Sequence, residues 1–267
     1  MTVVASKNTT EQVILGELVA QLLEREGESP VVRKLNLGGT FVCDAGLRAG
    51  AIDVYVEYTG TIVSALFHET VPRDPAAALA RARELYAARG VTVLPRLGFN
   101  NTFAMLVRGD DARRNGWTTI DDLRPFAGTL RPGFGHEFLE REDGYRGFVR
   151  AYELPFAGPP LGMELSLIYR ALADGQVDLV AGDATSALID RLDLVALRDT
   201  RQYFAPYDAV PVARTATLRA RPALARALER LSGRVPESTM RTLNAEVDIE
   251  KQDVREVVRK FVAALTP

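Results

Sequence analysis

Two stretches of this sequence repeat one pattern: residues 47–54 read LRAGAIDV and residues 172–179 read LADGQVDL. Leucine, glycine and aspartate match, and the strand positions around the aspartate stay apolar. A helix that ends in a glycine turn and leads into an apolar run is typical of a helix followed by a parallel strand. The pattern therefore predicts two similar α/β lobes, with chance recurrence of a short motif as the alternative.

The repeat also aligns the residues that follow each predicted strand. Its register sets Tyr58 against Asp183, each just past the carboxyl end of a strand. In open α/β sheets, ligands bind at that edge. We therefore expect a cleft between the two lobes, with Tyr58 and Asp183 facing it from opposite sides.

Strand and helix patterns alternate along the rest of the chain. Thr9 and Gln12 have the spacing of a capping box, and apolar residues then recur on one helical face up to Gly27. Such alternation predicts parallel sheets covered by helices. We expect further strands at residues 3–5, 31–35, 52–56, 91–94, 103–107 and 177–180, and further helices at residues 41–49, 75–89, 120–123, 165–173, 222–231, 236–245 and 254–265.

Composition excludes several classes of protein. The chain has 267 residues, 47% hydrophobic and 25% charged, which is the balance of an ordinary soluble globular protein. The 33 basic and 35 acidic side chains give a net charge of −2. Because there is no basic excess, we expect neither a nucleic-acid partner nor binding to a membrane surface.

The number and spacing of cysteine and histidine residues and the length of the apolar runs exclude further kinds of site and protein. A single cysteine, Cys43, cannot form an intrachain disulfide, and His68 and His136 lie too far apart for zinc-ligand spacing. We expect no metal and no cofactor. No run approaches the roughly 18 apolar residues of a membrane span, and no secretory leader follows Met1. A cytoplasmic protein, a mature exported protein and a domain of a longer chain all fit.

Few motifs carry chemistry. There is neither a phosphate-binding P-loop nor the Gly-x-Ser-x-Gly turn of hydrolases. Residues 38–40 (GGT) precede a predicted helix and could hold an anion or form a tight turn. Aromatic residues cluster with asparagines in loops and at strand ends, at residues 55–58, 99–103 and 203–207. Such clusters suit a small ligand with a cationic or apolar head and a polar tail.

Several segments occur in a familiar order: SKNTTEQ at residues 6–12, LGGT at 37–40, IDVYVEYTGT at 52–61, FNNTFA at 99–104, EFLEREDGY at 137–145 and YFAPY at 203–207. In these segments the chain resembles the substrate-binding proteins of osmoprotectant ABC importers, the glycine betaine/choline/carnitine-binding family. The similarity extends over nearly the whole sequence.

The resemblance implies a type II periplasmic-binding-protein fold of class α/β, in which two α/β lobes are joined by two hinge strands. Lobe one would hold residues 1–101 plus 208–267, and lobe two residues 102–207. It implies a non-enzymatic receptor that delivers a small cationic or zwitterionic solute to an ABC permease and its ATPase. It also implies a monomer in the periplasm or another extracytoplasmic space, associated with the membrane through the transporter.

The resemblance also implies a set of ligand-binding residues. Members of the family enclose a quaternary ammonium group with tyrosines, and the matching positions here are Tyr58 (or Tyr55), Phe103, Asp183 and Tyr207. The full predicted set is Ser6, Lys7, Asn8, Thr40, Tyr58, Thr59, Asn101, Phe103, Arg141, Asp183, Thr185 and Tyr207.

Two positions depart from the family pattern. Phe103 keeps the ring but lacks the hydroxyl, and Asp183 replaces a ring by a carboxylate. An aromatic face contributes up to about 2 kcal/mol to binding a cation, whereas an unpaired buried carboxylate costs several kcal/mol. Asp183 therefore favours a ligand with N–H donors over a trimethylammonium compound. The alternative is that Asp183 pairs with a protein group such as Arg141.

Two other functions fit the same bilobal scaffold. An enzyme would need an acid/base pair, for which Asp183, Glu57 and His136 are the available groups. A sensor domain would signal through a partner protein instead of feeding a transporter. Proximity of the gene to a permease and an ATPase would separate these possibilities.

Overall fold

The computed structural model describes residues 1–27, 30–140, 144–165 and 167–265. The chain separates into two compact units, which we call unit 1 (Met1–Asn101 and Pro206–Pro267) and unit 2 (Thr102–Ala205). The compact units divide the chain after residue 205, two residues before the predicted boundary. The Tyr207 N–H donates to Asn100 Oδ1 at 2.7 Å, and the Tyr207 carbonyl accepts from the Asn101 N–H at 3.0 Å, so Tyr207 belongs to unit 1.

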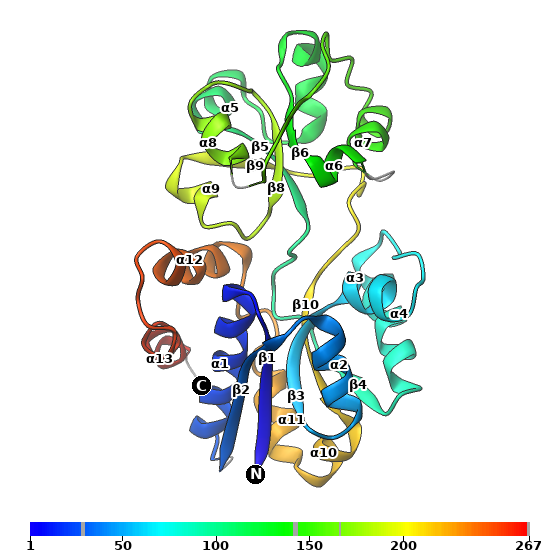
Figure 1. Ribbon diagram of the computed structural model, residues 1–267, viewed down its shortest axis with the longest axis vertical. Helices are drawn as coiled ribbons and strands as arrows, with labels where there is room; N and C mark the ends of the chain where they lie inside the picture. Colours follow the sequence, from blue (N-terminus) through cyan, green and yellow to red (C-terminus); the bar gives the residue numbers. More distant parts are fainter. Residues whose placement is uncertain (28–29, 141–143, 166, 266–267) are drawn as a thin grey trace. The chain divides into compact units, whose positions relative to one another are not determined.

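Unit 1 is built on a five-stranded sheet of order β2-β1-β3-β10-β4 (Figure 1). Strands β1 (Thr2–Lys7), β2 (Val31–Gly38) and β3 (Val54–Tyr58) are parallel, as predicted. Strand β10 (Ala209–Arg214) is antiparallel to β3 and to β4 (Val91–Val93). The sheet is therefore mixed, because β10 enters it from the chain that returns from unit 2.

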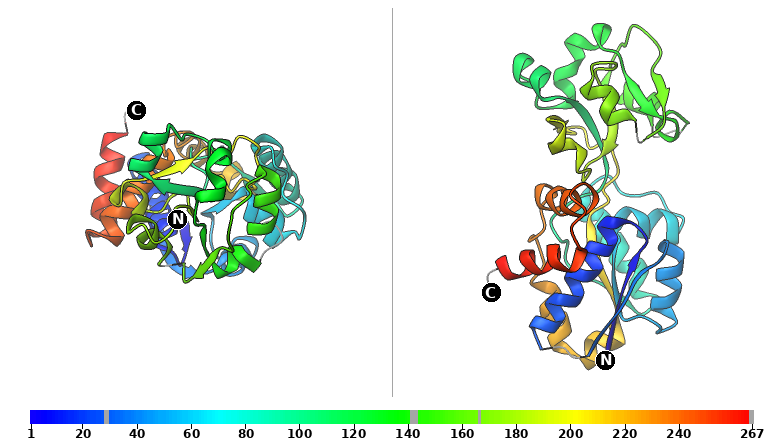
Figure 2. Two further views of the ribbon diagram at one scale, coloured as in Figure 1. Left: turned by 90° about the horizontal axis from the view of Figure 1, so that it is seen from above. Right: turned by 60° about the vertical axis from the view of Figure 1, so that its left-hand side comes forward.

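Helices cover both faces of this sheet, as Figures 1 and 2 show. On one face, α1 (Thr10–Arg25), α11 (Pro222–Glu229), α12 (Glu237–Asp248) and α13 (Val254–Ala264) share one hydrophobic core. On the other, α2 (Thr40–Arg48) and α4 (Pro75–Ala87) pack on a second core that contains Cys43 and Tyr86. Helix α10 (Thr215–Ala220) follows β10.

Helix α1 starts as predicted but not by the predicted mechanism. Thr9 is its N-cap residue, yet the Thr9 side chain makes no capping hydrogen bond. The capping box is therefore wrong. The Gln12 side chain is buried, with the residue only 1% exposed, so it is not available at the exposed start of the helix.

Unit 2 has a three-stranded sheet in which β5 (Phe103–Arg108) lies between β8 (Val180–Asp183) and β9 (Leu194–Leu197), antiparallel to both. Strands β6 (Gly133–Gly135) and β7 (Leu161–Met163) form a parallel pair. Its helices are α5 (Gly109–Asn115), a 3-10 helix (Ile120–Thr129), α6 (His136–Glu140), α7 (Tyr145–Tyr152), α8 (Ile168–Ala173) and α9 (Leu188–Arg191). The core is rich in aromatic rings, with Phe134 and Phe138 at 5.0 Å between centroids.

The repeated aspartate makes the same two backbone contacts in each unit. In unit 1, the Asp53 N–H donates to the Val3 carbonyl at 2.8 Å, and the Val3 N–H donates to Asp53 Oδ2 at 2.9 Å. In unit 2, the Asp178 N–H donates to the Arg131 carbonyl at 2.8 Å, and the Arg131 N–H donates to Asp178 Oδ2 at 3.0 Å. The sequence repeat is thus a structural repeat that fixes the start of a neighbouring strand.

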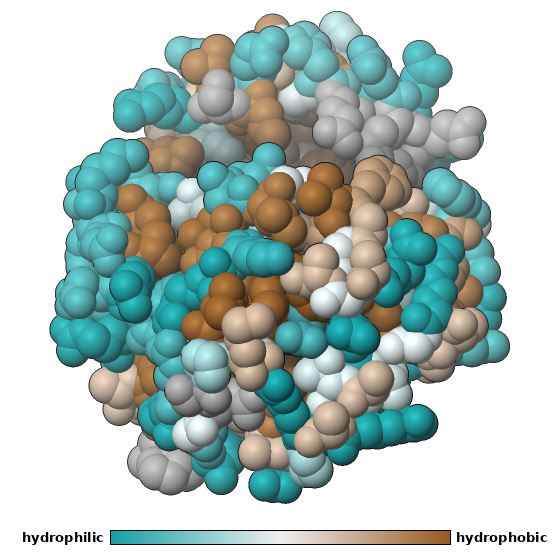
Figure 3. All heavy atoms as spheres, turned by 60° about the horizontal axis from the view of Figure 1, so that its bottom comes forward, coloured by the Kyte–Doolittle hydropathy of each residue, from teal (hydrophilic) through white to brown (hydrophobic). Residues whose placement is uncertain are grey.

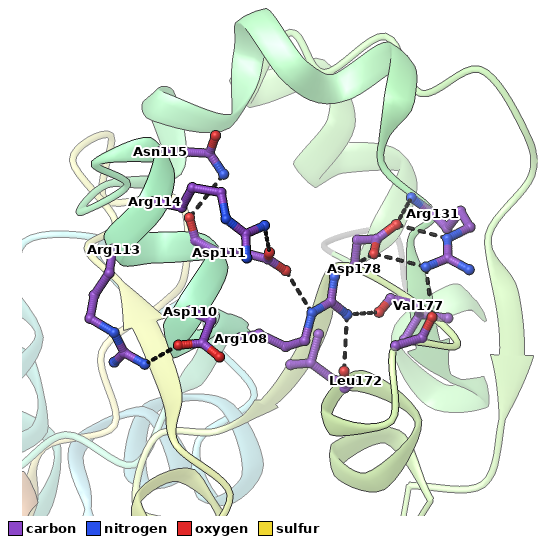
Figure 4. A network of polar contacts seen from close by, with 11 residues as sticks. Arg108, Asp110, Asp111, Arg113, Arg114, Asn115, Arg131, Leu172, Val177 and Asp178 are labelled. Carbon is purple, nitrogen blue, oxygen red and sulfur yellow. Dashed lines mark hydrogen bonds and ion pairs between the residues drawn. The ribbon is translucent and has the colours of Figure 1, made fainter.

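An arginine from the antiparallel strand completes each contact. Arg214, the last residue of β10, has Nη1 at 3.7 Å from Asp53 Oδ1. Arg108, the last residue of β5, has Nη2 at 2.6 Å from Asp178 Oδ1 (Figure 4). Arg108 also binds Asp111 and the carbonyls of Leu172 and Val177. The arginine therefore lies closer to its aspartate in unit 2 than in unit 1.

The surface mixes hydrophobic and hydrophilic side chains on the face drawn in Figure 3. Among the larger hydrophobic residues, Val42 at the start of α2 is 50% exposed and Leu167 just before α8 is 53% exposed. These two hold equivalent positions in the repeat. Within the described ranges, no helix is both long and apolar enough to cross a bilayer.

Candidate functional site

Most of the predicted residues of unit 1 meet at one edge of its sheet. Strands β1, β2 and β3 are parallel and end there, and β10 begins there, with Ala209 paired to Tyr58. The chain crosses to and from unit 2 beside the same edge, at Asn101 and Pro206. The predicted residues at this edge are Ser6, Lys7, Asn8, Thr40, Tyr58, Thr59, Asn101 and Tyr207.

Tyr58 lies at the centre of a buried polar cluster. Its hydroxyl donates a short hydrogen bond to the Glu11 carboxylate, which also accepts from the side-chain amides of Asn101 and Asn244, each at 3.1 Å. Burial and the adjacent Glu11 carboxylate hold the pKa of Tyr58 well above its usual range. The hydroxyl is therefore a protonated donor to Glu11. Because Tyr58 is only 9% exposed, it offers little ring surface to a ligand.

The Lys7 side chain contacts the Tyr58 ring and is buried from solvent. The Lys7 ammonium forms an ion pair with Glu57 and lies 4.6 Å from the centroid of the Tyr58 ring. Glu57 is fully buried and also accepts the Tyr58 N–H at 2.9 Å. The Lys7 charge is thus compensated inside the fold, and one approach to the Tyr58 ring is taken by this cation.

Two small hydroxyl side chains are engaged by the backbone. Ser6 donates to the Lys7 carbonyl and accepts from the Asn36 N–H, both at 2.9 Å. Thr59 Oγ1 accepts the Asp208 N–H at 3.1 Å, while the Thr59 N–H donates to the Asp208 carbonyl at 3.0 Å. These bonds tie the carboxyl edge to the segment that returns from unit 2. Asn8 is exposed and Thr40 half-buried at the same edge.

Tyr207 owes its position to a glycine. A Cβ atom on Gly60 would lie 2.7 Å from the Pro206 carbonyl oxygen and 2.8 Å from the Tyr207 ring, so only glycine fits there. Gly60 belongs to a short helical turn (Thr59–Thr61) that continues as a π-helix (Ile62–Leu66). Single turns of π-helix are frequent at functional sites.

Sequence reasoning missed Gln12. Gln12 is 1% exposed, and neither its amide nitrogen nor its amide oxygen has a hydrogen-bond partner among the described residues. The amide lies near enough to the Tyr58 hydroxyl to lower the pKa of that tyrosine, without the geometry of a hydrogen bond. Buried amides are normally satisfied, and the Tyr58 hydroxyl is the polar group that lies beside this one. The signal was present in the TEQ segment, where Gln12 was assigned to a capping box instead.

Unit 2 presents its own predicted residues at the end of β8. Asp183 is exposed, pairs with Phe103 across β5 and β8, and donates its backbone N–H to the Tyr169 hydroxyl at 2.9 Å. The Phe103 ring packs on Phe138 with centroids 5.2 Å apart. Thr185 is 3% exposed. Arg141, the predicted alternative partner of Asp183, lies outside the described residues.

The backbone bears out the register that aligned Tyr58 with Asp183. Tyr58 pairs with the first residue of β10 and Asp183 with the first residue of β5. The next residue donates its N–H to the crossing segment in both cases, Thr59 to Asp208 at 3.0 Å and Ala184 to Thr102 at 3.0 Å. Each residue thus holds the same place in its own unit. That the two face one cleft stays a prediction.

The described part of the chain holds no cluster of three or more histidine, cysteine, aspartate or glutamate residues that could bind a metal ion. The edge of unit 1 instead contains side-chain amides, a tyrosine and charged groups that are paired within the fold. Such groups bind and orient a small molecule.

Residues 2–264 match the family described as the substrate binding domain of ABC-type glycine betaine transport systems. The chain belongs to this family. The carnitine transport binding protein OpuCC of Listeria monocytogenes is 32% identical over 257 residues, which cover 95% of this chain and 83% of that protein. The glycine-betaine-binding protein of Pseudomonas aeruginosa is 32% identical over 269 residues, covering 97% and 86%.

A solved structure supports the same assignment. A protein described as a glycine betaine/carnitine/choline ABC transporter superposes with a TM-score of 0.93 at 28% identity, covering 98% of each chain. The predicted fold class, a type II periplasmic-binding-protein fold with two α/β lobes, is confirmed. The chain is a solute receptor of an ABC importer and not an enzyme, and the family acts outside the cytoplasm. The comparisons give no support to an enzyme.

Proposed function

We propose that the solute is a small zwitterion or cation that carries N–H groups, and that the chain delivers it to an ABC permease. The observation that carries this proposal is Asp183. Asp183 is an exposed residue at the carboxyl end of β8, at the position that the repeat aligns with Tyr58. A carboxylate forms charge-assisted hydrogen bonds with N–H donors, which a trimethylammonium group lacks.

The edge of unit 1 supports the same ligand class. Tyr58 is almost buried and Lys7 lies over its ring, so little aromatic surface is left for a quaternary ammonium group. Asn101 is half-buried at the same edge, and a side-chain amide suits the polar or anionic end of a zwitterion. Relatives named for carnitine and for glycine betaine support a small zwitterion as the solute, and Asp183 favours the members of that class that carry N–H groups.

Isothermal titration of two Asp183 variants tests the proposal. Asp183→Asn keeps the shape of the side chain and removes its charge, so the affinity for an N–H-bearing ligand should fall by about 1.5 kcal/mol or more. Asp183→Tyr should improve binding of glycine betaine or choline and weaken binding of the N–H-bearing ligand. A panel of amino acids, polyamines, betaine, choline and carnitine supplies the ligands. Equal binding by Asp183→Asn and the parent protein would remove the basis of the proposal.

We also propose that residues of both units contact the solute and that the units act as lobes whose relative orientation changes on binding. Predicted contacts are divided between them: Phe103, Asp183 and Thr185 belong to unit 2, Tyr58 and Tyr207 to unit 1. Small-angle scattering with and without saturating solute tests this, and an unchanged radius of gyration would contradict it. We propose further that the receptor is a monomer, binds no nucleic acid and meets its permease in the periplasm or an equivalent extracytoplasmic space.

A further inference from the structure

Unit 1 contains a cavity that the solute site does not use. Its volume is about 460 Å³, within the range of small-molecule pockets. Its walls come from α4 (Leu79, Arg83), from the segment after β4 (Pro95, Arg96) and from Asp208, the residue before β10. None of the predicted ligand-binding residues at the carboxyl edge lines it.

One polar group that lines this cavity is the largely buried Asp208 carboxylate. Asp208 is 8% exposed, and its Oδ2 atom is buried without a hydrogen-bond partner among the described residues. Arg96 Nη1 lies 3.6 Å away, close enough for an ion pair but too far for a hydrogen bond. A buried carboxylate oxygen that accepts no hydrogen bond is costly, so this atom is suited to an incoming N–H donor.

Two guanidinium groups accompany that carboxylate. Arg83 donates its Nε–H to the Val93 carbonyl at 3.2 Å, and the rest of its side chain is exposed. The Arg96 side chain is 42% exposed. Guanidinium groups bind carboxylates with paired hydrogen bonds. Leu79 and Pro95 add an apolar wall to the same cavity.

We infer that this cavity binds an α-amino acid with a small aliphatic side chain, as a second ligand site in unit 1. The ligand ammonium group would donate to Asp208, its carboxylate would bind Arg83 and Arg96, and its side chain would contact Leu79 and Pro95. A zwitterion matches the mixed charge of the cavity. An N-trimethylated amino acid does not fit, because it has no N–H to offer Asp208.

The position of Asp208 links this cavity to the solute site. The Asp208 backbone exchanges hydrogen bonds with Thr59, which follows Tyr58 at the carboxyl edge. A ligand bound to the Asp208 side chain therefore contacts a residue whose backbone is hydrogen-bonded to the sequence neighbour of Tyr58. The second site needs no assumption about the identity of the transported solute.

Isothermal titration of the full chain with L-alanine and L-leucine tests the inference. The decisive variant is Arg83→Gln, since Arg83 is exposed and its change is compatible with folding. Asp208→Asn removes the other partner. Arg219→Gln, an exposed arginine on α10 that does not line the cavity, is the matched control. Asp183→Asn reports on the edge of unit 2.

We expect both amino acids to show a binding event that is the same in the parent protein, Arg219→Gln and Asp183→Asn, and at least about tenfold weaker in Arg83→Gln and Asp208→Asn. Any separate binding at Asp183 is recognised by its loss in Asp183→Asn. N-trimethylalanine should show no binding that depends on Arg83. Absence of amino-acid binding at millimolar concentration would overturn the inference. So would a single binding event that Arg83→Gln leaves intact and Asp183→Asn abolishes, because that result places the amino acid at unit 2.

Discussion

The two units use one backbone plan with different chemistry beneath the candidate site. Counted from the aspartate that fixes the start of each strand, Glu57 of unit 1 and Gly182 of unit 2 hold the same position. Lys7 and Gly135 likewise correspond, since each lies equally far from the residue bound by its aspartate. Unit 1 thus has a buried ion pair where unit 2 has two glycines.

In unit 2 a tyrosine fills the space beside Gly182. A Cβ atom on Gly182 would lie 2.7 Å from the Tyr169 hydroxyl, which accepts the Asp183 N–H. In unit 1 the corresponding support for Tyr58 comes from Glu57 and Lys7. The comparison teaches that equal backbones can present an almost buried ring in one unit and an exposed carboxylate in the other.

The buried ion pair of unit 1 should give the largest effect when broken. Lys7→Met leaves the fully buried Glu57 without its cationic partner, and we expect unit 1 to lose about 3 to 5 kcal/mol of stability. Urea unfolding followed by far-UV circular dichroism measures this. Trp117, the one tryptophan of the chain, lies in unit 2, so its fluorescence reports on that unit separately.

The control is the double variant Lys7→Met/Glu57→Gln, which removes both charges and should recover much of the loss. If the double variant were as unstable as Lys7→Met, the ion pair would not be the cause. A matching shift of the Trp117 transition would show that the effect is not confined to unit 1.

The two repeated aspartates should differ in how much they contribute to stability. Asp178 meets Arg108 and Arg131 at 2.6 and 2.9 Å, whereas Asp53 has Arg214 only at 3.7 Å. We expect Asp178→Ala to destabilise unit 2 by about 3 kcal/mol and Asp53→Ala to destabilise unit 1 by about 1.5 kcal/mol. Unfolding monitored by Trp117 fluorescence and by circular dichroism compares them. Equal losses would contradict the ranking.

Acid should remove the Asp178 contribution. Burial raises the pKa of Asp178, but hydrogen bonds from Arg131 and Arg108 outweigh it and lower the pKa from 3.8 to about 2. A carboxylate with a lowered pKa in the folded state stabilises the protein above its unfolded pKa. The stability difference between the parent protein and Asp178→Ala should therefore shrink as pH falls from 3.8 toward 2. A difference independent of pH would indicate packing instead of charge.

Adding a methyl group at Gly182 should destabilise unit 2 less than Asp178→Ala does. Gly182→Ala forces Tyr169 away from the Asp183 N–H, and we expect about 1 to 2 kcal/mol of destabilisation in unit 2. Gly128→Ala, where the nearest atom lies 3.9 Å from the new Cβ, is the matched control. In the Tyr169→Phe background the Gly182→Ala cost should fall only in part, because the hydroxyl is gone but the ring atom Cε1, 2.8 Å from the new Cβ, remains. An unchanged cost would place the clash elsewhere, for example at Leu106.

The smallest expected effect is on affinity, at Gly60. This residue corresponds to Thr185 of unit 2, but Tyr207 packs against it. Gly60→Ala should displace the Tyr207 ring and weaken solute binding about tenfold, or about 1.4 kcal/mol. Gly39→Ala, at the same edge with no atom within 4 Å of the new Cβ, should bind as the parent does. Titration calorimetry compares the two variants.

Local patterns in the sequence were enough for the α/β class, the repeated aspartate and the strand ends at Tyr58 and Asp183. Periodicity sets these features within a few residues, as the predicted strand 103–107 and the observed Phe103–Arg108 illustrate. The repeat could be found because both copies conserve a glycine turn and an aspartate whose contacts are to the backbone.

The chemistry beneath the site could not be predicted in the same way. Glu57 meets Lys7, and Tyr58 meets Glu11, across about fifty residues of chain, and no local pattern encodes such pairs. Lys7 and Ser6 were therefore predicted only as ligand-binding residues, although the fold engages both. Gln12 was misassigned because a threonine and a glutamine three residues apart fit both a helix cap and a buried amide.

The order of strands in unit 1 has a consequence for biosynthesis. Strand β10 lies between β3 and β4, yet it is made after the whole of unit 2. During translation, β4 therefore has no neighbour in its sheet until the ribosome has produced residues 209–214, and the helices α11, α12 and α13 that cover one face follow later still. Unit 2, encoded by one continuous segment, can fold while unit 1 waits. A ribosome stalled far enough past residue 205 for unit 2 to have left the exit tunnel, with β10 still inside it, should carry a folded unit 2 and an unfinished unit 1.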